Sequence, residues 1–388
     1  MKIGKLATLA LTVTLCVAGC SGFWDAPVNP TPPTTLSSGF FYVLNFAASQ
    51  VAGFSVKTGV VTAVTGSPTT LSAAPIAVTV APNNAFLYVS TLSGIYLYSV
   101  AASTGQITLG NGSQAVSADQ AASMQVDSTN SWLIEAFTGS PNLFAIHISP
   151  TDGTVVTTIP ASVALPAATI QQIAIAPNNA FVYVAMGTAG TAVVPFNAGN
   201  SNPFGSVVTI PAKSSAGGAI SVAVDPLTTT TTTPRLLYIG ETAATSGSNT
   251  GGLRVFNYST LQEISGSPFA INGLAPSAIL PFSTGKFVYV LNRQVSGSST
   301  GVITGFSIAA SNSTYTLTPL GKTFTVGTNP QSLVEDNTGN FIFAVNFGGS
   351  PDLTGYTIDS TNEGYLDNVI SSATGTDPAS AIQVAALH

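Results

Sequence analysis

Charged residues are scarce in this chain of 388 residues: Lys and Arg number 9 and Asp and Glu 15, together 6% of the sequence. An average soluble domain is about 25% charged. The few basic residues are scattered, which excludes nucleic acid as a partner and excludes docking to a membrane through a polybasic patch. Ser, Thr, Asn, Gln and Gly supply the polar surface instead. Such a surface, with Thr-rich alternating runs, is typical of a β protein outside the cytoplasm.

Long apolar stretches are also lacking, except at the N-terminus. Lys2 and Lys5 lead into Leu6–Val17, which has the length of a signal-peptide core and is too short to span a membrane. The next residues, Val17-Ala18-Gly19-Cys20, resemble the bacterial lipobox, in which the cysteine thiol takes up diacylglycerol. We therefore expect residues 1–19 to be a lipoprotein signal peptide and Cys20 to carry the membrane anchor. The alternative is an ordinary secretory signal with a chance cysteine.

The position of the anchor has two consequences. Ser21, not Asp, follows the cysteine, which predicts sorting to the outer membrane of a bacterial envelope, with the periplasmic or surface side left open. Pro27, Pro30, Pro32 and Pro33 favour an extended tether, so residues 20–38 are expected to hold the following domain away from the bilayer.

Cysteine and histidine are nearly absent. The only cysteines are Cys16 and Cys20, and the only histidines are His147 and His388. Once Cys16 leaves with the signal peptide, no internal disulfide, thiolate metal cluster or catalytic cysteine is left. Without Lys2 and Lys5, seven basic residues face 15 acidic ones, a net charge of −8. We expect neither a metal nor a cofactor, and we expect a monomer.

A repeated pattern fills the rest of the chain. A short apolar strand, a turn rich in Pro, Asn or Asp, and an aromatic strand recur, as in Ile76–Val80 followed by Phe86-Leu87-Tyr88-Val89. The first residues of the aromatic strands are 46 to 55 residues apart; they are Phe40, Phe86, Trp132, Phe181, Leu236, Phe287 and Phe341. A third strand, such as Gly94–Val100, and a looser fourth, such as Val60–Thr65, complete each interval. Four short strands per unit are typical of a propeller blade.

The first unit lacks its innermost strand, and the C-terminal segment Ala379–Leu387 looks like that strand with nothing after it. The sequence therefore predicts an all-β fold, a seven-bladed β-propeller of four antiparallel strands per blade over residues 39–388. Its ring would close by pairing of the C-terminal strand with the N-terminal blade.

The pattern Pro-x-x-Val-x-Val-x-Pro-Asn-x-x-Phe-x-Tyr-Val, read from Pro75 to Val89, resembles the seven-bladed lactonase-like propellers. That group includes enzymes of the 6-phosphogluconolactonase type and YVTN-repeat surface proteins. The resemblance implies the fold and, more weakly, metal-independent lactone hydrolysis, because its matching residues belong to the scaffold. The family's catalytic residues find no counterparts here.

Two residues of the third unit are candidates for catalysis. Glu135 stands where other units have Val, and a turn centred on Pro141 would place it opposite His147. The functional interpretation is an imidazole base oriented by a carboxylate. The alternatives are a local polar pair within the blade, or no contact, because a shift of one residue would put the two on opposite faces.

A second set of candidates suits ligand binding. Glu241 and Asn292 end equivalent strands, Arg293 follows Asn292, and Arg254 is predicted to face Glu241. Such a cluster could bind an anionic or polyhydroxylated ligand, since Arg binds carboxylates in a bidentate manner. The alternative is turn capping by Asn with one surface salt bridge.

Three hypotheses about function remain. The first is a lipid-anchored module that binds a protein, a glycan or a small polar ligand without strong catalytic machinery, which the scarcity of catalytic residues favours. The second is a lactone hydrolase, supported by the family resemblance. The third is a structural spacer or pseudo-enzyme of the cell envelope.

Overall fold

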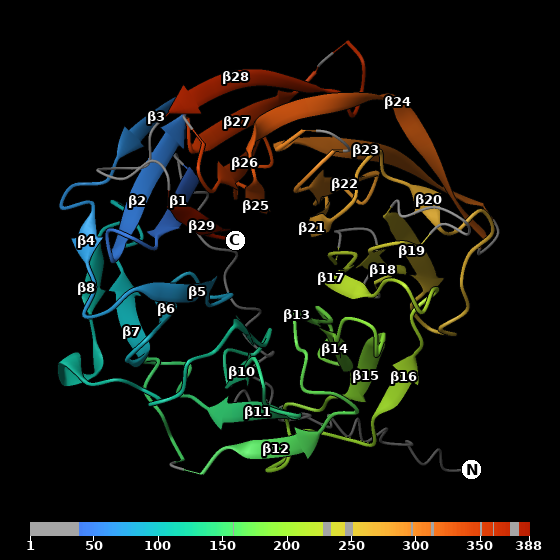
Figure 1. Ribbon diagram of the computed structural model, residues 1–388. Helices are drawn as coiled ribbons and strands as arrows, with labels where there is room; N and C mark the ends of the chain where they lie inside the picture. Colours follow the sequence, from blue (N-terminus) through green and yellow to red (C-terminus); the bar gives the residue numbers. More distant parts are fainter. Residues whose placement is uncertain are drawn as a thin grey trace, which may run out of the picture. The chain divides into compact units, whose positions relative to one another are not determined.

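Each repeat unit folds into one antiparallel sheet, and the sheets are arranged in a ring (Figure 1). The computed structural model describes residues 39–157, 159–227, 234–244, 251–295, 298–311, 314–349, 351–359, 361–372 and 380–388. The predicted signal peptide, the tether and Cys20 lie outside these residues.

The first four blades hold strands β1 to β16 and β29. Blade 1 consists of β29 (Ala381–Ala386), β1 (Gly39–Asn45), β2 (Gln50–Lys57), β3 (Val60–Ala63) and β4 (Thr69–Thr70). Blade 2 consists of β5 (Pro75–Val80), β6 (Phe86–Thr91), β7 (Gly94–Val100) and β8 (Ile107–Leu109), followed by the 3-10 turn η1 (Asn111–Ser113). Blade 3 consists of β9 (Ser123–Val126), β10 (Trp132–Ala136), β11 (Asn142–His147) and β12 (Ala161–Ala164). Blade 4 consists of β13 (Gln172–Ile175), β14 (Phe181–Ala185), β15 (Thr191–Pro195) and β16 (Val208–Ile210).

The last three blades repeat the arrangement. Blade 5 consists of β17 (Ala219–Val224), β18 (Leu236–Glu241), β19 (Gly252–Asn257) and β20 (Phe269–Ala270). Blade 6 consists of β21 (Pro276–Pro281), β22 (Phe287–Asn292), β23 (Thr300–Ser311) and β24 (Thr314–Thr328). Blade 7 consists of β25 (Pro330–Glu335), β26 (Phe341–Asn346), β27 (Leu353–Ile358) and β28 (Leu366–Ser372).

The ring closes as the sequence predicts. β29 pairs antiparallel with β1 from Phe41↔Ala386 to Asn45↔Ala381, so the innermost strand of the first sheet comes from the C-terminal segment. In Figure 1 the red β29 lies beside the blue β1. The inner strands of neighbouring blades also contact each other around the whole circle, including β25 with β29 and β29 with β5. Pairing with β29 therefore covers the inner edge of β1, which would otherwise have no partner strand.

The hydrophobic core is divided among the blade interfaces. Seven clusters of buried side chains lie one at each interface, because every sheet packs on both of its faces. The second strand of a blade is therefore buried along its whole length, as in β6 and β22. This double burial explains why these strands read as continuous apolar runs without a polar alternation.

Tyrosines of these second strands link neighbouring blades. The hydroxyl of Tyr42 donates to the Gly105 carbonyl at 2.7 Å, and that of Tyr88 donates to the Gly153 carbonyl at 2.7 Å. Both acceptors lie in the turn between the third and fourth strands of the next blade. The repeated Tyr-Val pattern thus marks a hydrogen bond as well as a core position.

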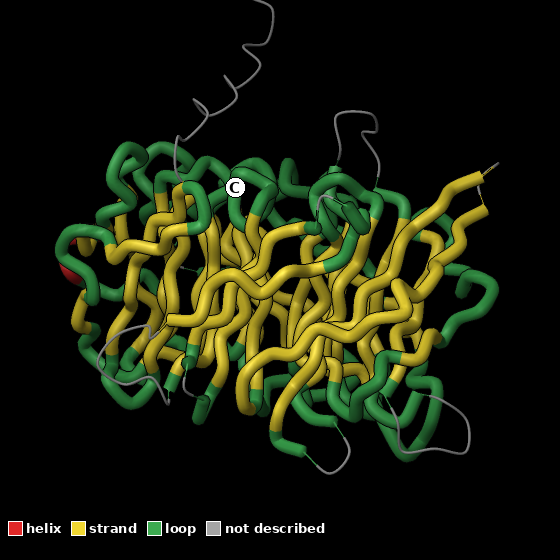
Figure 2. The backbone as a smooth tube through the Cα atoms, turned by 90° about the horizontal axis from the view of Figure 1, so that it is seen from above, coloured by secondary structure: helices red, strands yellow, loops and turns green. Residues whose placement is uncertain are grey.

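The strands run between two faces made of loops (Figure 2). Inner strand β5 begins at Pro75, beside Thr91 at the end of β6. We call the face where the inner strands begin the mouth face, and the other the far face. Gly39 begins β1 on the far face, because β1 runs antiparallel to the inner strand β29.

Candidate functional site

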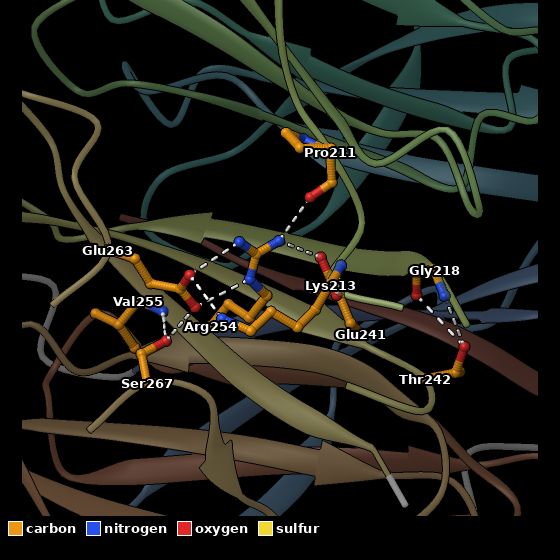
Figure 3. Close-up of polar contacts among 9 residues, drawn as sticks. All are labelled: Pro211, Lys213, Gly218, Glu241, Thr242, Arg254, Val255, Glu263 and Ser267. Atoms are coloured by element: carbon orange, nitrogen blue, oxygen red, sulfur yellow. Dashed lines mark hydrogen bonds and ion pairs between the residues drawn. The ribbon is translucent and has the colours of Figure 1, made fainter. Parts of the chain in front are cut away.

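Glu241 and Arg254 come together, as the sequence predicts, in a buried cluster between blades 4 and 5 (Figure 3). Arg254 Nη1 donates to Glu241 Oε1 at 2.9 Å and to the Pro211 carbonyl at 2.7 Å. Arg254 Nε and Nη2 bind the two carboxylate oxygens of Glu263, both at 3.0 Å. The guanidinium is therefore held by three protein groups from two blades.

The remaining polar groups of this cluster complete the network. Lys213 binds Glu263 at 3.2 Å through its ammonium and donates its backbone N–H to Glu241 at 2.9 Å. Against the effect of burial, hydrogen bonds from Arg254 and Ser267 lower the pKa of Glu263 to about 2. Burial also opposes the charge of Arg254, but the two carboxylates raise its pKa. Arg254 thus bridges the two carboxylates of blade 5, and its bond to the Pro211 carbonyl links them to blade 4.

Asn292 is fully buried and holds a loop. Its amide donates to the Ile271 carbonyl at 2.7 Å and, at 3.4 Å, to Thr304 Oγ1. Thr304 Oγ1 itself donates to the Ile271 carbonyl. These bonds fasten the loop before β21 to strands β22 and β23.

Arg293 lies at a different place, on the wall of a cavity of about 300 Å³ where the central channel opens on the mouth face. All seven blades line this cavity, through the first residues of their inner strands. Neutral polar side chains dominate the wall, namely Ser123, Gln171, Gln172, Ser277, Gln331, Ser332 and Gln383. Arg293 is the one charged residue among the described lining residues.

The Arg293 guanidinium has no carboxylate partner among the residues that the structure describes. Its side chain is open to solvent, and partial desolvation lowers its pKa. A cation that stands unpaired in a polar cavity is free to bind an anion.

Several channel-lining residues hold neighbouring inner strands together. Their side chains form hydrogen bonds with the backbone of the next blade, which the sequence did not reveal. The Gln383, Gln125 and Gln172 side chains accept from the backbone N–H groups of Val78 (2.8 Å), Ile175 (2.6 Å) and Val222 (3.0 Å). The Ser221 and Ser277 hydroxyls donate to the carbonyls of Pro276 (2.7 Å) and Pro330 (3.2 Å). The only sign of these hydrogen bonds in the sequence was the presence of Gln and Ser in otherwise apolar inner strands.

Glu135 does not pair with His147. The register places Phe144 opposite Glu135 and Trp132 opposite His147, so the two side chains point to opposite faces of the sheet. The midpoint of the turn lies between Gly139 and Ser140, since Ala136 pairs with Leu143, and not at Pro141. The turn centre at Pro141 is therefore wrong, and the alternative of no contact between Glu135 and His147 agrees with this register.

Glu135 is fully buried between blades 2 and 3, and neither of its carboxyl oxygens has a hydrogen-bond partner among the described residues. Burial, and to a smaller extent the charge of Asp119, raises the pKa of Glu135 to about 8. The carboxyl is thus neutral at pH 7 and out of contact with solvent.

His147 lies near the far face. Its ring stacks on Trp132, with centroids 4.7 Å apart and an interplanar angle of 27°. Glu135, His147 and Arg293 therefore occupy three separate places in the propeller.

Two further features of the described part of the chain bear on its chemistry. It contains no group of three or more His, Cys, Asp or Glu side chains that could hold a metal ion. It also contains no helix that is long and apolar enough to span a membrane.

Comparisons with known proteins agree with this architecture. Residues 241–382 match the family model described as "Lactonase, 7-bladed beta-propeller". No curated protein matches the chain. A Bacteroides fragilis protein, proposed to be a 6-phosphogluconolactonase, superimposes with a TM-score of 0.68 at 13% identity, covering 92% of this chain and 100% of that one.

The periplasmic gluconolactonase of Pseudomonas aeruginosa superimposes with a TM-score of 0.65 at 14% identity, covering 91% of this chain and 99% of that one. Identities this low support the fold alone. The chain is therefore a seven-bladed β-propeller, and its residues 241–382 match the lactonase propeller family model.

Proposed function

We propose that this protein binds a small anionic, polyhydroxylated molecule at the mouth of its central channel. The observation that carries the proposal is Arg293, a cation without a carboxylate partner among the described residues, in a cavity of about 300 Å³. Guanidinium groups bind carboxylates and phosphates through paired hydrogen bonds. The neutral amides and hydroxyls around Arg293 suit the hydroxyl groups of the same ligand.

The similar structures narrow the ligand class. One of them is named a gluconolactonase, and the open form of such a lactone is a sugar acid with one carboxylate and several hydroxyls. A sugar acid of this kind combines the two features that the channel mouth recognises. We therefore take D-gluconate as the first ligand to test.

Binding without turnover is the expected activity. Lactone hydrolysis without a metal needs a general base near the scissile bond and a group that stabilises the oxyanion. Arg293 could stabilise an oxyanion, but the described lining of the channel mouth holds no carboxylate or imidazole. Glu135 lies between blades 2 and 3, and His147 lies near the far face. Turnover of glucono-δ-lactone at the uncatalysed rate would agree with the proposal, and enzymatic turnover would support the hydrolase alternative.

The proposal includes an envelope location. Cys20 would be lipidated and would become the first residue once residues 1–19 are removed, and the Pro-rich residues that follow would act as the tether. Mass spectrometry of the mature protein tests this directly, because lipidation adds the mass of acyl chains to an N-terminal peptide that begins at Cys20. The Cys20→Ser variant should keep its signal peptide and lose that mass.

Calorimetric titration with D-gluconate tests the ligand site. D-Sorbitol is the matched neutral probe, because it replaces the carboxylate by an alcohol. We expect gluconate to bind more tightly than sorbitol, and Arg293→Gln to weaken gluconate binding about tenfold or more, since a hydrogen bond to a charged group contributes about 1.5–3 kcal/mol.

Lys57→Gln is the matched control for the loss of one positive charge, because Lys57 is an exposed residue at the far-face end of β2. It should leave gluconate binding unchanged. Equal affinity of the wild type and Arg293→Gln, or the absence of gluconate binding, would overturn the proposal.

A further inference from the structure

A second pocket, of about 660 Å³, lies between blades 3 and 4 near the far face. It is formed by the start of β10, the end of β11 and the loops that follow the third strands of both blades. Its volume is in the range of sites that hold a small molecule. We call it the Trp132 pocket.

Two stacked rings are part of its wall. Trp132 and His147 are cross-strand partners with ring centroids 4.7 Å apart. The Trp132 indole N–H donates to the Ala198 carbonyl of blade 4 at 2.9 Å, which fixes the indole across the blade interface. The pocket wall is therefore preorganised, and a ligand would not have to order it.

The rim of the Trp132 pocket exposes large apolar side chains. Ile159 is 83% exposed and Val156 is 54% exposed, although both line the pocket. Burial of such side chains is favourable in proportion to the apolar area removed from water. Exposed apolar groups around a hollow are therefore a common mark of a binding site.

The polar groups of the pocket are hydroxyls, amides and the ring nitrogens of Trp132 and His147. Thr157, Asn200 and Ser201 offer hydroxyl and amide groups, and no Asp, Glu, Lys or Arg is among the described lining residues. A charged ligand would lose hydration there without gaining an ionic partner. This chemistry differs from that of the channel mouth, where Arg293 stands.

We infer that the Trp132 pocket binds a small neutral ring compound, with an apolar ring face against Ile159 and Val156 and a hydroxyl edge toward Asn200 and Ser201. Two kinds of molecule share this chemistry, the neutral sugars and the alicyclic alcohols. The inference is independent of the anion site proposed for Arg293.

Tryptophan fluorescence can test this inference, because the chain has only two tryptophans, Trp24 and Trp132. In a chain with Cys20→Ser and Trp24→Phe, Trp132 becomes the sole tryptophan reporter. Methyl β-D-glucopyranoside probes the sugar class and cyclohexanol probes the alicyclic alcohols. We expect a saturable change in Trp132 emission with at least one of the two probes.

Ile159→Ser should weaken that response about tenfold, because it removes an exposed apolar contact and leaves the core unchanged. Val60→Ser is the matched control, since Val60 is 63% exposed on the outer strand of blade 1. It should leave the response unchanged, and so should Arg293→Gln. The inference is overturned if neither probe gives a saturable change, or if Ile159→Ser responds like the unmodified pocket.

Discussion

Asn84 and His388 hydrogen-bond to each other through both ends of the Asn84 side-chain amide. Asn84 Nδ2 donates to the His388 carbonyl at 2.7 Å, and the His388 backbone N–H donates to Asn84 Oδ1 at 2.7 Å, although the two residues are 304 positions apart. Asn84 belongs to the turn after β5 of blade 2, and His388 follows β29 of blade 1. This pair thus fastens the closing strand to the next blade.

Substitution of Asn84 tests how much its contact with His388 contributes to ring closure. Asn84 has a positive φ of 59°, a conformation that Gly adopts freely and that costs Ala additional strain. Asn84→Gly removes only the amide and should lower the free energy of unfolding by about 1–3 kcal/mol for two hydrogen bonds. Asn84→Ala should lower it further.

Urea denaturation of both variants measures these differences. A Gly stands in the same kind of turn in blades 6 and 7, at Gly285 and Gly339, so the backbone itself tolerates the change. An Asn84→Gly variant as stable as the wild type would mean that the contact with His388 contributes nothing to ring closure.

Much of the fold could be predicted because the repeat is long and its hydrophobic pattern is regular. The predicted strand Gly94–Val100 agrees with β7, and the closing segment Ala379–Leu387 contains β29. Blade 6 departs from the predicted pattern of short strands, because its third and fourth strands, β23 and β24, extend to 12 and 15 residues. The sequence of a single repeat unit does not indicate how far such a hairpin extends.

The sites were harder to predict because they depend on register and on contacts between blades. The Glu241–Arg254 pair lies within one sheet, on strands adjacent in sequence, and its contact was predicted correctly. The register of β10 and β11 depends on the geometry of a single turn. Because the turn was predicted one to two residues too late, His147 was expected on the same face of the sheet as Glu135, whereas it lies on the opposite face. The channel mouth combines residues from all seven blades, which no local pattern reveals.

Glu135 should make the stability of the protein depend on pH. Its pKa is raised from 4.5 to about 8, so between these values the folded state holds a proton that the unfolded chain releases. Stability from this group is therefore complete below about pH 4.5 and is lost as the pH rises toward 8, by at most about 1.4 kcal/mol per pH unit.

Glu135→Val is the informative variant, because Val occupies this position in several other units, as at Val89 and Val184. It should be more stable than the wild type at pH 7, and the difference between the two should grow from pH 5 to pH 8. Comparison with the wild type removes the contributions of Glu335 and Asp225, whose pKa values burial also raises, to about 7 and about 6. A difference that does not change with pH would show that Glu135 keeps an ordinary pKa.

The tyrosine hydroxyls should differ in their contributions. The Tyr88 hydroxyl donates to the Gly153 carbonyl, whereas the buried Tyr183 hydroxyl has no partner among the described residues. Tyr88→Phe should therefore lower the free energy of unfolding by about 1 kcal/mol, and Tyr183→Phe should leave it unchanged or raise it. Chemical denaturation of the two variants compares the same substitution at equivalent positions of two repeat units. A larger loss of unfolding free energy for Tyr183→Phe than for Tyr88→Phe would contradict the difference in hydrogen bonding.

Arg254 should be structural. Arg254→Gln leaves the carboxylates of Glu241 and Glu263 at a buried interface, which should cost about 3–5 kcal/mol of stability. Adding Glu241→Gln should recover part of this loss, since one of the uncompensated charges is removed. Thermal denaturation gives both values, and gluconate binding by the folded fraction should stay as in the wild type. A stable Arg254→Gln variant that no longer binds gluconate would assign Arg254 to the ligand site instead.

The most direct measurement of the central claim is a crystal structure of the protein grown with D-gluconate. The account predicts a gluconate molecule in the channel mouth, its carboxylate within hydrogen-bond distance of the Arg293 guanidinium and its hydroxyls toward the surrounding Gln and Ser side chains. Gluconate bound elsewhere, or an empty channel mouth at saturating gluconate, would contradict it.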